Sequence, residues 1–161
     1  MPTTVARSID LSSPPEDVWA VLGEFGAISS WAPNVDHSVL LEGSPGIGGS
    51  RRIQTGSSTL VETVTAWDPP STLSYDIEGL PQVVRHVSNT WHVYGHDGGS
   101  RVTLASVIDT GSRPPGPIVA RVVGRLLGRA SEQMLTGLRN RLLAIEGAQE
   151  RRSAERTAAN G

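Results

Sequence analysis

The chain has 161 residues, the size of one domain with a single core. It has no cysteine, which excludes disulfides, thiolate metal sites and cysteine nucleophiles. It has no apolar run of roughly 18 residues, and residues 1–11 lack a basic head followed by an apolar stretch. We therefore expect a cytoplasmic protein with no membrane span and no secretory signal.

Charge is distributed unevenly along the chain. Residues 1–112 hold five arginines against twelve acids, a net of -7, whereas residues 113–161 hold nine arginines against four acids, a net of +5. The total of -2 gives no electrostatic reason to expect a nucleic-acid partner.

The first part of the chain predicts a strand followed by two short helices. Residues 3–11 alternate as a strand does, although Arg7 interrupts the apolar face. Pro14 and Pro15, preceded by serines and followed by acids, are typical of a helix start. A second short helix is predicted over 27–31.

Residues 35–110 then read as six strands separated by turn residues. The predicted strands cover 35–42, 50–55, 59–67, 72–78, 83–94 and 101–110. The cleanest alternation places Tyr75 between Leu73 and Ile77 on one face. Because these strands follow one another through short turns, the pattern indicates an antiparallel sheet.

The longest predicted element is a helix over 118–145. Its apolar face consists of Val119, Val122, Val123, Leu126, Leu127, Ala130, Met134, Leu138, Leu142 and Ile145. Its other face carries Arg121, Arg125, Arg129, Glu132 and Arg139, which we interpret as a solvated surface. The polar, small-residue-rich segment 148–161 predicts a disordered tail after one domain over 1–147.

Together these elements predict an α+β fold, a curved seven-stranded antiparallel sheet wrapped around the long C-terminal helix. Ala130 and Gly137 lie near the middle of the apolar helix face. Such small residues leave space between helix and sheet, so the pattern indicates an internal cavity.

The element order and several local strings resemble the START-like superfamily, also called the helix-grip or polyketide cyclase/dehydrase-like (SRPBCC) group. The strings lie at 13–19, 25–33, 48–52, 62–70, 73–75 and 99–104, and the resemblance covers about 3–147. It implies a deep hydrophobic pocket under the C-terminal helix. Members include polyketide aromatases and cyclases, lipid carriers and hormone receptors, so the fold alone does not decide the function.

The resemblance and the strand patterns together suggest site residues. Compared with the abscisic-acid receptors of this superfamily, Glu62 matches a pocket glutamate and His37 falls near a pocket lysine. The receptors' gate-loop string is absent, with Gly56-Ser57-Ser58 in its place, which argues against a receptor function. His37 shares a predicted inward face with apolar neighbours; the alternation of Glu62 is compatible with either face. A Glu62 buried without a cation would suit acid/base work.

The remaining candidates face the predicted cavity. Tyr75 is inward by pattern and its hydroxyl needs a partner once buried. Arg85 fits either the cavity or a place at its rim. The full predicted ligand-binding set is His37, Glu62, Tyr75, Arg85, Asn89, Trp91, Leu104, Ser106, Ala130 and Met134, and the catalytic candidates are Glu62, His37 and Tyr75.

No metal or cofactor is predicted, because the four histidines fall on different faces. Two functions remain open. One is a monomeric or homodimeric binder of a small hydrophobic molecule such as a lipid, a polyketide or an aromatic compound. The other is a cyclase/dehydratase-type enzyme that acts on such a ligand by acid/base chemistry. A protein-partner module, resting only on the arginine stripe, is a third and weaker reading.

Overall fold

The computed structural model describes residues 2–43, 45–111, 113 and 115–161. Its elements in chain order are β1 (Thr3–Leu11), α1 (Pro15–Leu22), the 3-10 helix η1 (Phe25–Ser30), β2 (His37–Glu42), β3 (Ser50–Thr55), β4 (Ser58–Asp68), β5 (Thr72–Glu78), β6 (His86–His96), β7 (Gly99–Asp109) and α2 (Gly116–Ala159). Within these ranges the strands form one seven-stranded antiparallel sheet in the order β1-β7-β6-β5-β4-β3-β2. The predicted helix-grip architecture is confirmed.

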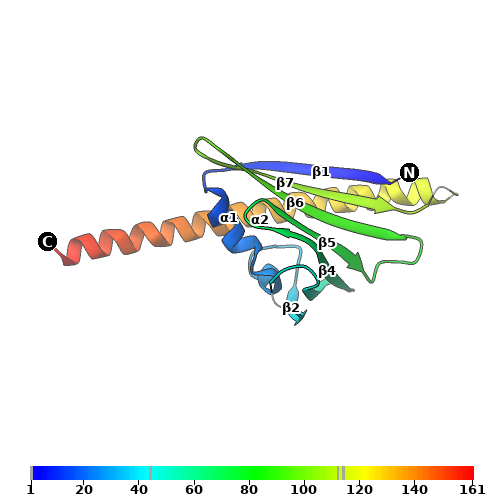
Figure 1. Cartoon of the computed structure of the whole chain (residues 1–161), viewed down its shortest axis with the longest axis horizontal. Coiled ribbons are helices and arrows are strands. Elements are labelled where there is room, and N and C mark those ends of the chain that lie inside the picture. Colours follow the sequence, from blue (N-terminus) through cyan, green and yellow to red (C-terminus); the bar gives the residue numbers. More distant parts are fainter. Residues whose placement is uncertain (1, 44, 112, 114) are drawn as a thin grey trace.

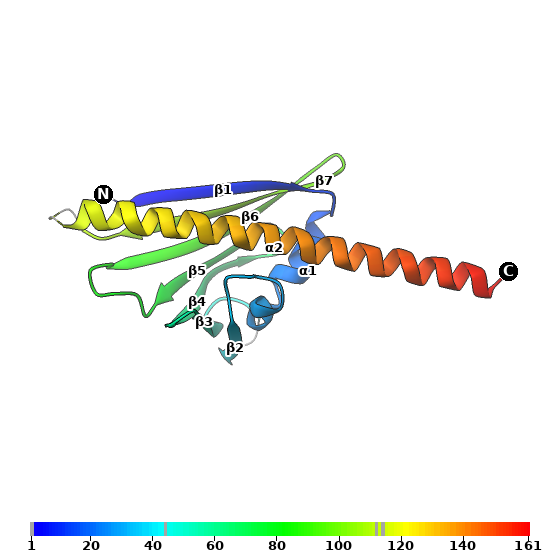
Figure 2. The ribbon, with the colours of Figure 1, turned by 180° about the vertical axis from the view of Figure 1, so that it is seen from behind.

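α2 lies across one face of the sheet, and β1 and β7 are the strands that contact it most (Figures 1 and 2). The short helices α1 and η1 lie on the same side, near the middle of α2. The Ser13 hydroxyl, just before α1, donates to Glu146 of α2 at 2.8 Å. The sheet face toward α2 carries the buried core, as the period-two alternation of β5, β6 and β7 predicts.

The face of α2 that packs on β1 differs from the predicted one. Gly124 and Gly128 are buried there, and a Cβ on Gly128 would lie 2.8 Å from Arg7 Nη2. Val122 and Leu126, predicted to fill the apolar face, are instead exposed. Glycines allow the helix axis to approach β1 closely, and this close approach rotates those two side chains away from the strand.

Gly137 also has another role than the predicted one. A Cβ at Gly137 would lie 2.2 Å from the Trp31 carbonyl oxygen and 2.7 Å from Pro33 Cδ. The chain just after η1 thus occupies the space above this glycine. Gly137 therefore permits a close backbone approach, and it gives no support to the expected cavity.

The C-terminal end of α2 also differs from the prediction. The helix continues to Ala159, beyond the predicted end at Ile145, so 148–159 are helical where the sequence predicted a disordered tail. This part projects past the sheet (Figure 1). Alanine, glutamate and arginine favour helix, and an anchored helix has already met the cost of nucleation, so elongation continues into solvent.

Candidate functional site

A row of polar side chains crosses the inner face of the sheet on three adjoining strands. Tyr75 of β5 is the direct cross-strand partner of Asn89 on β6, and Asn89 is the partner of Ser106 on β7. All three are buried. Their alignment follows from register: each occupies an inward position of its strand, as predicted.

These side chains form one hydrogen-bonded chain. The Ser106 hydroxyl donates to Asn89 Oδ1 at 2.6 Å, and Asn89 Nδ2 donates to the Tyr75 hydroxyl at 3.4 Å. Trp91 Nε1 donates to the same hydroxyl at 3.2 Å. The Tyr75 oxygen therefore accepts two N–H groups. Within the described ranges, no bond is found in which its own O–H is the donor.

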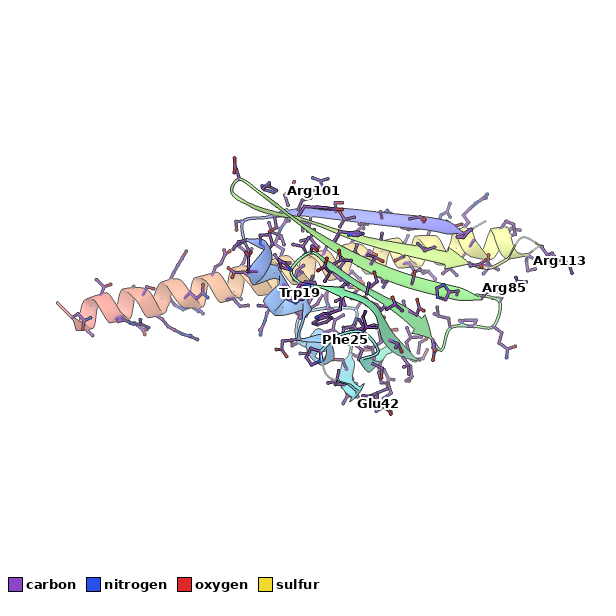
Figure 3. All side chains as sticks on the ribbon, viewed as in Figure 1. Trp19, Phe25, Glu42, Arg85, Arg101 and Arg113 are labelled. Atoms are coloured by element: carbon purple, nitrogen blue, oxygen red, sulfur yellow. The ribbon has the colours of Figure 1, made fainter. Side chains whose placement is uncertain are left out.

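A buried ion pair continues the polar row onto β3 and β4. Arg51 and Glu62 are cross-strand partners, and Arg51 Nε lies 2.7 Å from Glu62 Oε1. Arg51 Nη1 donates to the Phe25 carbonyl oxygen at 2.8 Å, and its guanidinium lies 3.8 Å from the centre of the Phe25 ring. Phe25 begins η1, below α1 in Figure 3. Glu62 is thus inward, and its carboxylate is held by a cation.

The two groups meet at Tyr75. The Arg51 guanidinium lies 4.8 Å from the centre of the Tyr75 ring, and Phe25 packs edge-on against the same ring at 5.6 Å. We call Arg51, Glu62, Tyr75, Asn89 and Ser106 the polar belt. It spans β3 to β7 within an otherwise apolar core.

The environment of Tyr75 keeps its hydroxyl protonated. Burial raises the pKa of Tyr75 above its ordinary value of 10.0, and the Glu62 carboxylate raises it further, while Arg51 and the two donors oppose the rise. At neutral pH the side chain is therefore a hydrogen-bond donor and not a base.

The sequence did not single out Arg51. An arginine in a strand is normally placed in solvent, although the alternation of β3 puts Arg51 on the same face as the buried Ile53. The pairing of β3 with β4 could have identified it. Once these two strands form a hairpin, Arg51 faces Glu62, and a buried carboxylate requires a cation such as this arginine.

Two predicted site residues lie elsewhere. His37 is exposed, because β2 is the edge strand and the inward position belongs to Ser38, whose hydroxyl donates to the Gly26 carbonyl oxygen at 2.8 Å. The prediction of an inward His37 is wrong. Arg85 is exposed just before β6, and its guanidinium lies close to Gly111. Figure 3 shows it at the end of the molecule where α2 begins, so it does not join the polar belt, and its place at a pocket rim stays a prediction.

The other predicted residues lie on the core side. Trp91 and Leu104 are buried on β6 and β7, Met134 is buried on α2, and Ala130 is half-buried. Their contact with a ligand stays a prediction, as does the cavity between sheet and helix. The five belt side chains are all buried.

A hollow of about 240 Å³ lies at a different place, between α1, η1 and the second half of α2. Trp31, Leu142 and Ile145 give it an apolar floor, and Asp17, Glu24 and Arg141 lie at its polar parts. It is open to solvent and shares no residue with the polar belt.

Two further features bear on function. In the described part of the chain, no three histidine, aspartate or glutamate side chains gather as metal ligands would. The helices found there also include none that is long and apolar enough to cross a bilayer.

The chain belongs to the polyketide cyclase/dehydrase and lipid transport family, whose model matches residues 2–143. No curated protein matches its sequence. Among solved structures it resembles the ZhuI aromatase/cyclase from Streptomyces sp. R1128, with 16% identity over 88% of this chain and 94% of that one and a TM-score of 0.76.

Two other solved structures show the same fold. Ara h 8.0201 has 18% identity, covers 89% of this chain and 99% of its own, and gives a TM-score of 0.72. A Thermobifida fusca protein has 26% identity over 86% of this chain and 92% of its own, with a TM-score of 0.73. The resemblances span an enzyme and proteins whose names state no reaction, so they leave the choice of function to the site.

Proposed function

We propose that this protein binds a small, mostly apolar molecule between the sheet and α2, with an oxygen atom of the ligand hydrogen-bonded to the polar belt. The observation that carries the proposal is the belt itself. Five polar side chains on the inner face of an apolar core lower stability unless each is satisfied, and an apolar core would need none of them.

The chemistry of the belt selects the ligand class. Tyr75 keeps its proton at neutral pH, so it offers an O–H to a carbonyl or hydroxyl oxygen. The aromatic rings of Phe25 and Trp91 lie against Tyr75 and supply flat apolar walls. A ligand with an aromatic or aliphatic body and one or two oxygens matches this combination, since such sites are mostly apolar with a few placed polar groups.

Because the belt side chains are buried, a ligand reaches them only when the elements that cover this face of the sheet move. α2 is held mainly by β1 and β7. The strands that carry Arg51, Glu62 and Tyr75 lie beyond its main contacts and are covered by η1 instead, through Phe25, so movement of η1 is the change that exposes this part of the belt.

The test is direct. The purified protein is examined by native mass spectrometry for a retained small molecule, and then titrated with oleic acid and with the hydroxyanthraquinone alizarin while the melting temperature is recorded. Binding of either compound raises the melting temperature by mass action. The proposal is contradicted if no small molecule is retained and neither compound shifts the melting temperature.

A matched pair of variants locates the site. Tyr75→Phe removes the belt hydroxyl and weakens binding about 5- to 10-fold, the worth of roughly one hydrogen bond of about 1 kcal/mol. Tyr94→Phe removes the other tyrosine hydroxyl of the chain, which is exposed on β6, and leaves affinity unchanged. Equal losses in both variants would place the ligand elsewhere.

A second candidate function is catalysis of the cyclase/dehydratase kind. It is favoured by one observation, the protonated Tyr75 beside the Arg51 cation, a combination that would polarise a ketone oxygen. Glu62 is committed to Arg51, which leaves the belt without an obvious base. Turnover of a poly-β-ketone substrate that falls roughly 10²-fold in Tyr75→Phe would support an enzyme, whereas a carrier loses only affinity.

A further inference from the structure

The first turns of α2 expose a row of large apolar side chains. Ile118, Val122 and Leu126 are 66%, 53% and 60% exposed. Residues four apart on a helix lie on one face, one above the next, so the three form a continuous apolar row of a little over two turns. Single exposed apolar residues are ordinary, but a row of three on one helix face requires an explanation.

A row of arginines runs beside it. Arg121, Arg125 and Arg129 have the same four-residue spacing and are all exposed. Residues 113–131 contain these three arginines and Arg113, and no acid at all. The first acid after them, Glu132, already pairs with Arg7 of β1 at 3.0 Å. Figure 3 shows Arg113 at the end of the molecule where α2 begins.

The fold buries neither row. α2 meets β1 through Gly124 and Gly128. The apolar row lies on the opposite side of the helix, and Arg121 and Arg125 lie between the two, at an open hollow beside β1. None of the six residues belongs to the polar belt or lines the hollow beside α1. Stability of the domain therefore gives no reason for apolar side chains at 118, 122 and 126.

We propose that this surface of α2, formed by Ile118, Arg121, Val122, Arg125, Leu126 and Arg129, docks on an anionic lipid membrane. The pattern is that of an interfacial helix, in which an apolar row enters the acyl boundary while neighbouring arginines meet lipid phosphates. Long arginine stems reach the headgroups while the apolar row lies deeper.

The charge of the whole chain favours the same orientation. Residues 1–112 carry a net of -7 and residues 113–161 a net of +5. An anionic surface attracts the helix and repels most of the sheet, which turns α2 toward the bilayer. A second copy of this chain is a poorer occupant, since self-pairing of the surface brings six arginines together with no acid between them.

The proposal is independent of the ligand-binding function, because vesicle binding is measured without any ligand. Vesicles of phosphatidylcholine with about 30% phosphatidylglycerol are compared with pure phosphatidylcholine vesicles by flotation. The protein is expected to float with the anionic vesicles only, and raising the salt to 1 M releases it, since screening shortens the reach of the charges to about 3 Å.

Two groups of arginines on the same helix provide the matched control. Changing Arg121, Arg125 and Arg129 to glutamine lowers the partition onto anionic vesicles roughly 100-fold. Changing Arg151, Arg152 and Arg156 to glutamine removes the same charge from the projecting end of α2, where no large apolar side chain lies beside the arginines, and lowers it far less. Equal losses would show that net charge alone binds, and would overturn the proposal.

The apolar row is tested separately. Ile118→Ser, Val122→Ser and Leu126→Ser together retain all arginines and are expected to reduce partition at least tenfold. Melting curves confirm that each variant is folded, and Leu126→Ser alone serves if the triple variant is not. The assignment is overturned if the wild-type protein does not bind anionic vesicles. It is also overturned if the protein forms a dimer at the same concentrations, because the surface would then be an interface between two copies.

Discussion

Arg51 and Glu62 face each other across the β3–β4 hairpin at 2.7 Å, with only 3% and 4% of their side chains exposed. The guanidinium also caps the Phe25 carbonyl and lies against two aromatic rings. One arginine therefore links the strand that begins the polar belt, the helix η1 and the tyrosine at the belt's centre.

From this ion pair we predict that the single variants of Arg51 and Glu62 are less stable than the double variant. Arg51→Met or Glu62→Leu alone leaves a buried charge without its partner and lowers the free energy of unfolding by about 3–5 kcal/mol. The double variant restores a neutral core, so it costs less than either single change, apart from about 1 kcal/mol for the Phe25 carbonyl that loses its donor. Urea unfolding of the four proteins measures the coupling.

The neighbouring arginine is the control for that cycle. Arg52→Met changes the next side chain on β3, which is exposed, and shifts the unfolding free energy by less than about 0.5 kcal/mol. Additive costs in the double variant would mean that the two charges do not compensate each other.

The raised pKa of Tyr75 predicts a loss of stability in alkali. In the unfolded chain tyrosine titrates near pH 10, whereas the pKa of folded Tyr75 is higher because of burial and the Glu62 carboxylate. The unfolded state then loses its proton first, so the contribution is complete below pH 10 and declines as pH rises through the folded pKa. The chain has no lysine and no cysteine, so few other groups titrate in this range.

Unfolding free energies measured between pH 8 and pH 11.5 test this. Tyr75→Phe flattens the decline above pH 10, and also lowers stability at pH 7 by about 1–3 kcal/mol because the Asn89 and Trp91 donors lose their acceptor. Tyr94→Phe keeps the wild-type slope. An unchanged slope in Tyr75→Phe would assign the alkaline effect to another group.

Much of the inner sheet face could be predicted from sequence. Strict alternation in β5, β6 and β7 placed Tyr75, Asn89 and Ser106 inward, and the structure confirms all three. Alternation reports which residues share a face but not where the strand sits in the sheet. His37 was misplaced for that reason, since β2 is an edge strand whose Val39 and Leu41 also remain exposed.

For α2, too, the sequence pattern identified the element but not the side of it that packs on the sheet. Apolar periodicity identified α2, but the side that meets β1 is made by Gly124 and Gly128, which carry no apolar side chain to count. Arg51 escaped detection because its burial depends on a partner eleven residues away across a hairpin. Local patterns cannot report such pairings until the strand register is known.

The projecting end of α2 gives a prediction about helicity. Residues 150–159 are exposed, so deletion of 150–161 leaves the melting temperature unchanged, since no core contact is lost. The mean residue ellipticity at 222 nm, however, falls because helical residues are removed. If the truncated protein has a higher mean helicity than the full chain, the result would show that this segment is disordered, as the composition suggested.

Two glycines of α2 give opposite predictions for the same substitution. Gly137→Ala places a Cβ 2.2 Å from the Trp31 carbonyl oxygen, a backbone atom that cannot rotate away, so we expect a loss of about 2–4 kcal/mol as η1 separates from α2. At Gly147 a Cβ meets only Arg151 Nη1 at 3.6 Å, an ordinary contact. Gly147→Ala therefore stabilises the helix by about 0.5–1 kcal/mol. Thermal and urea unfolding of both variants decide the matter, and a neutral Gly137→Ala would show that the chain after η1 does not pack on α2 as described.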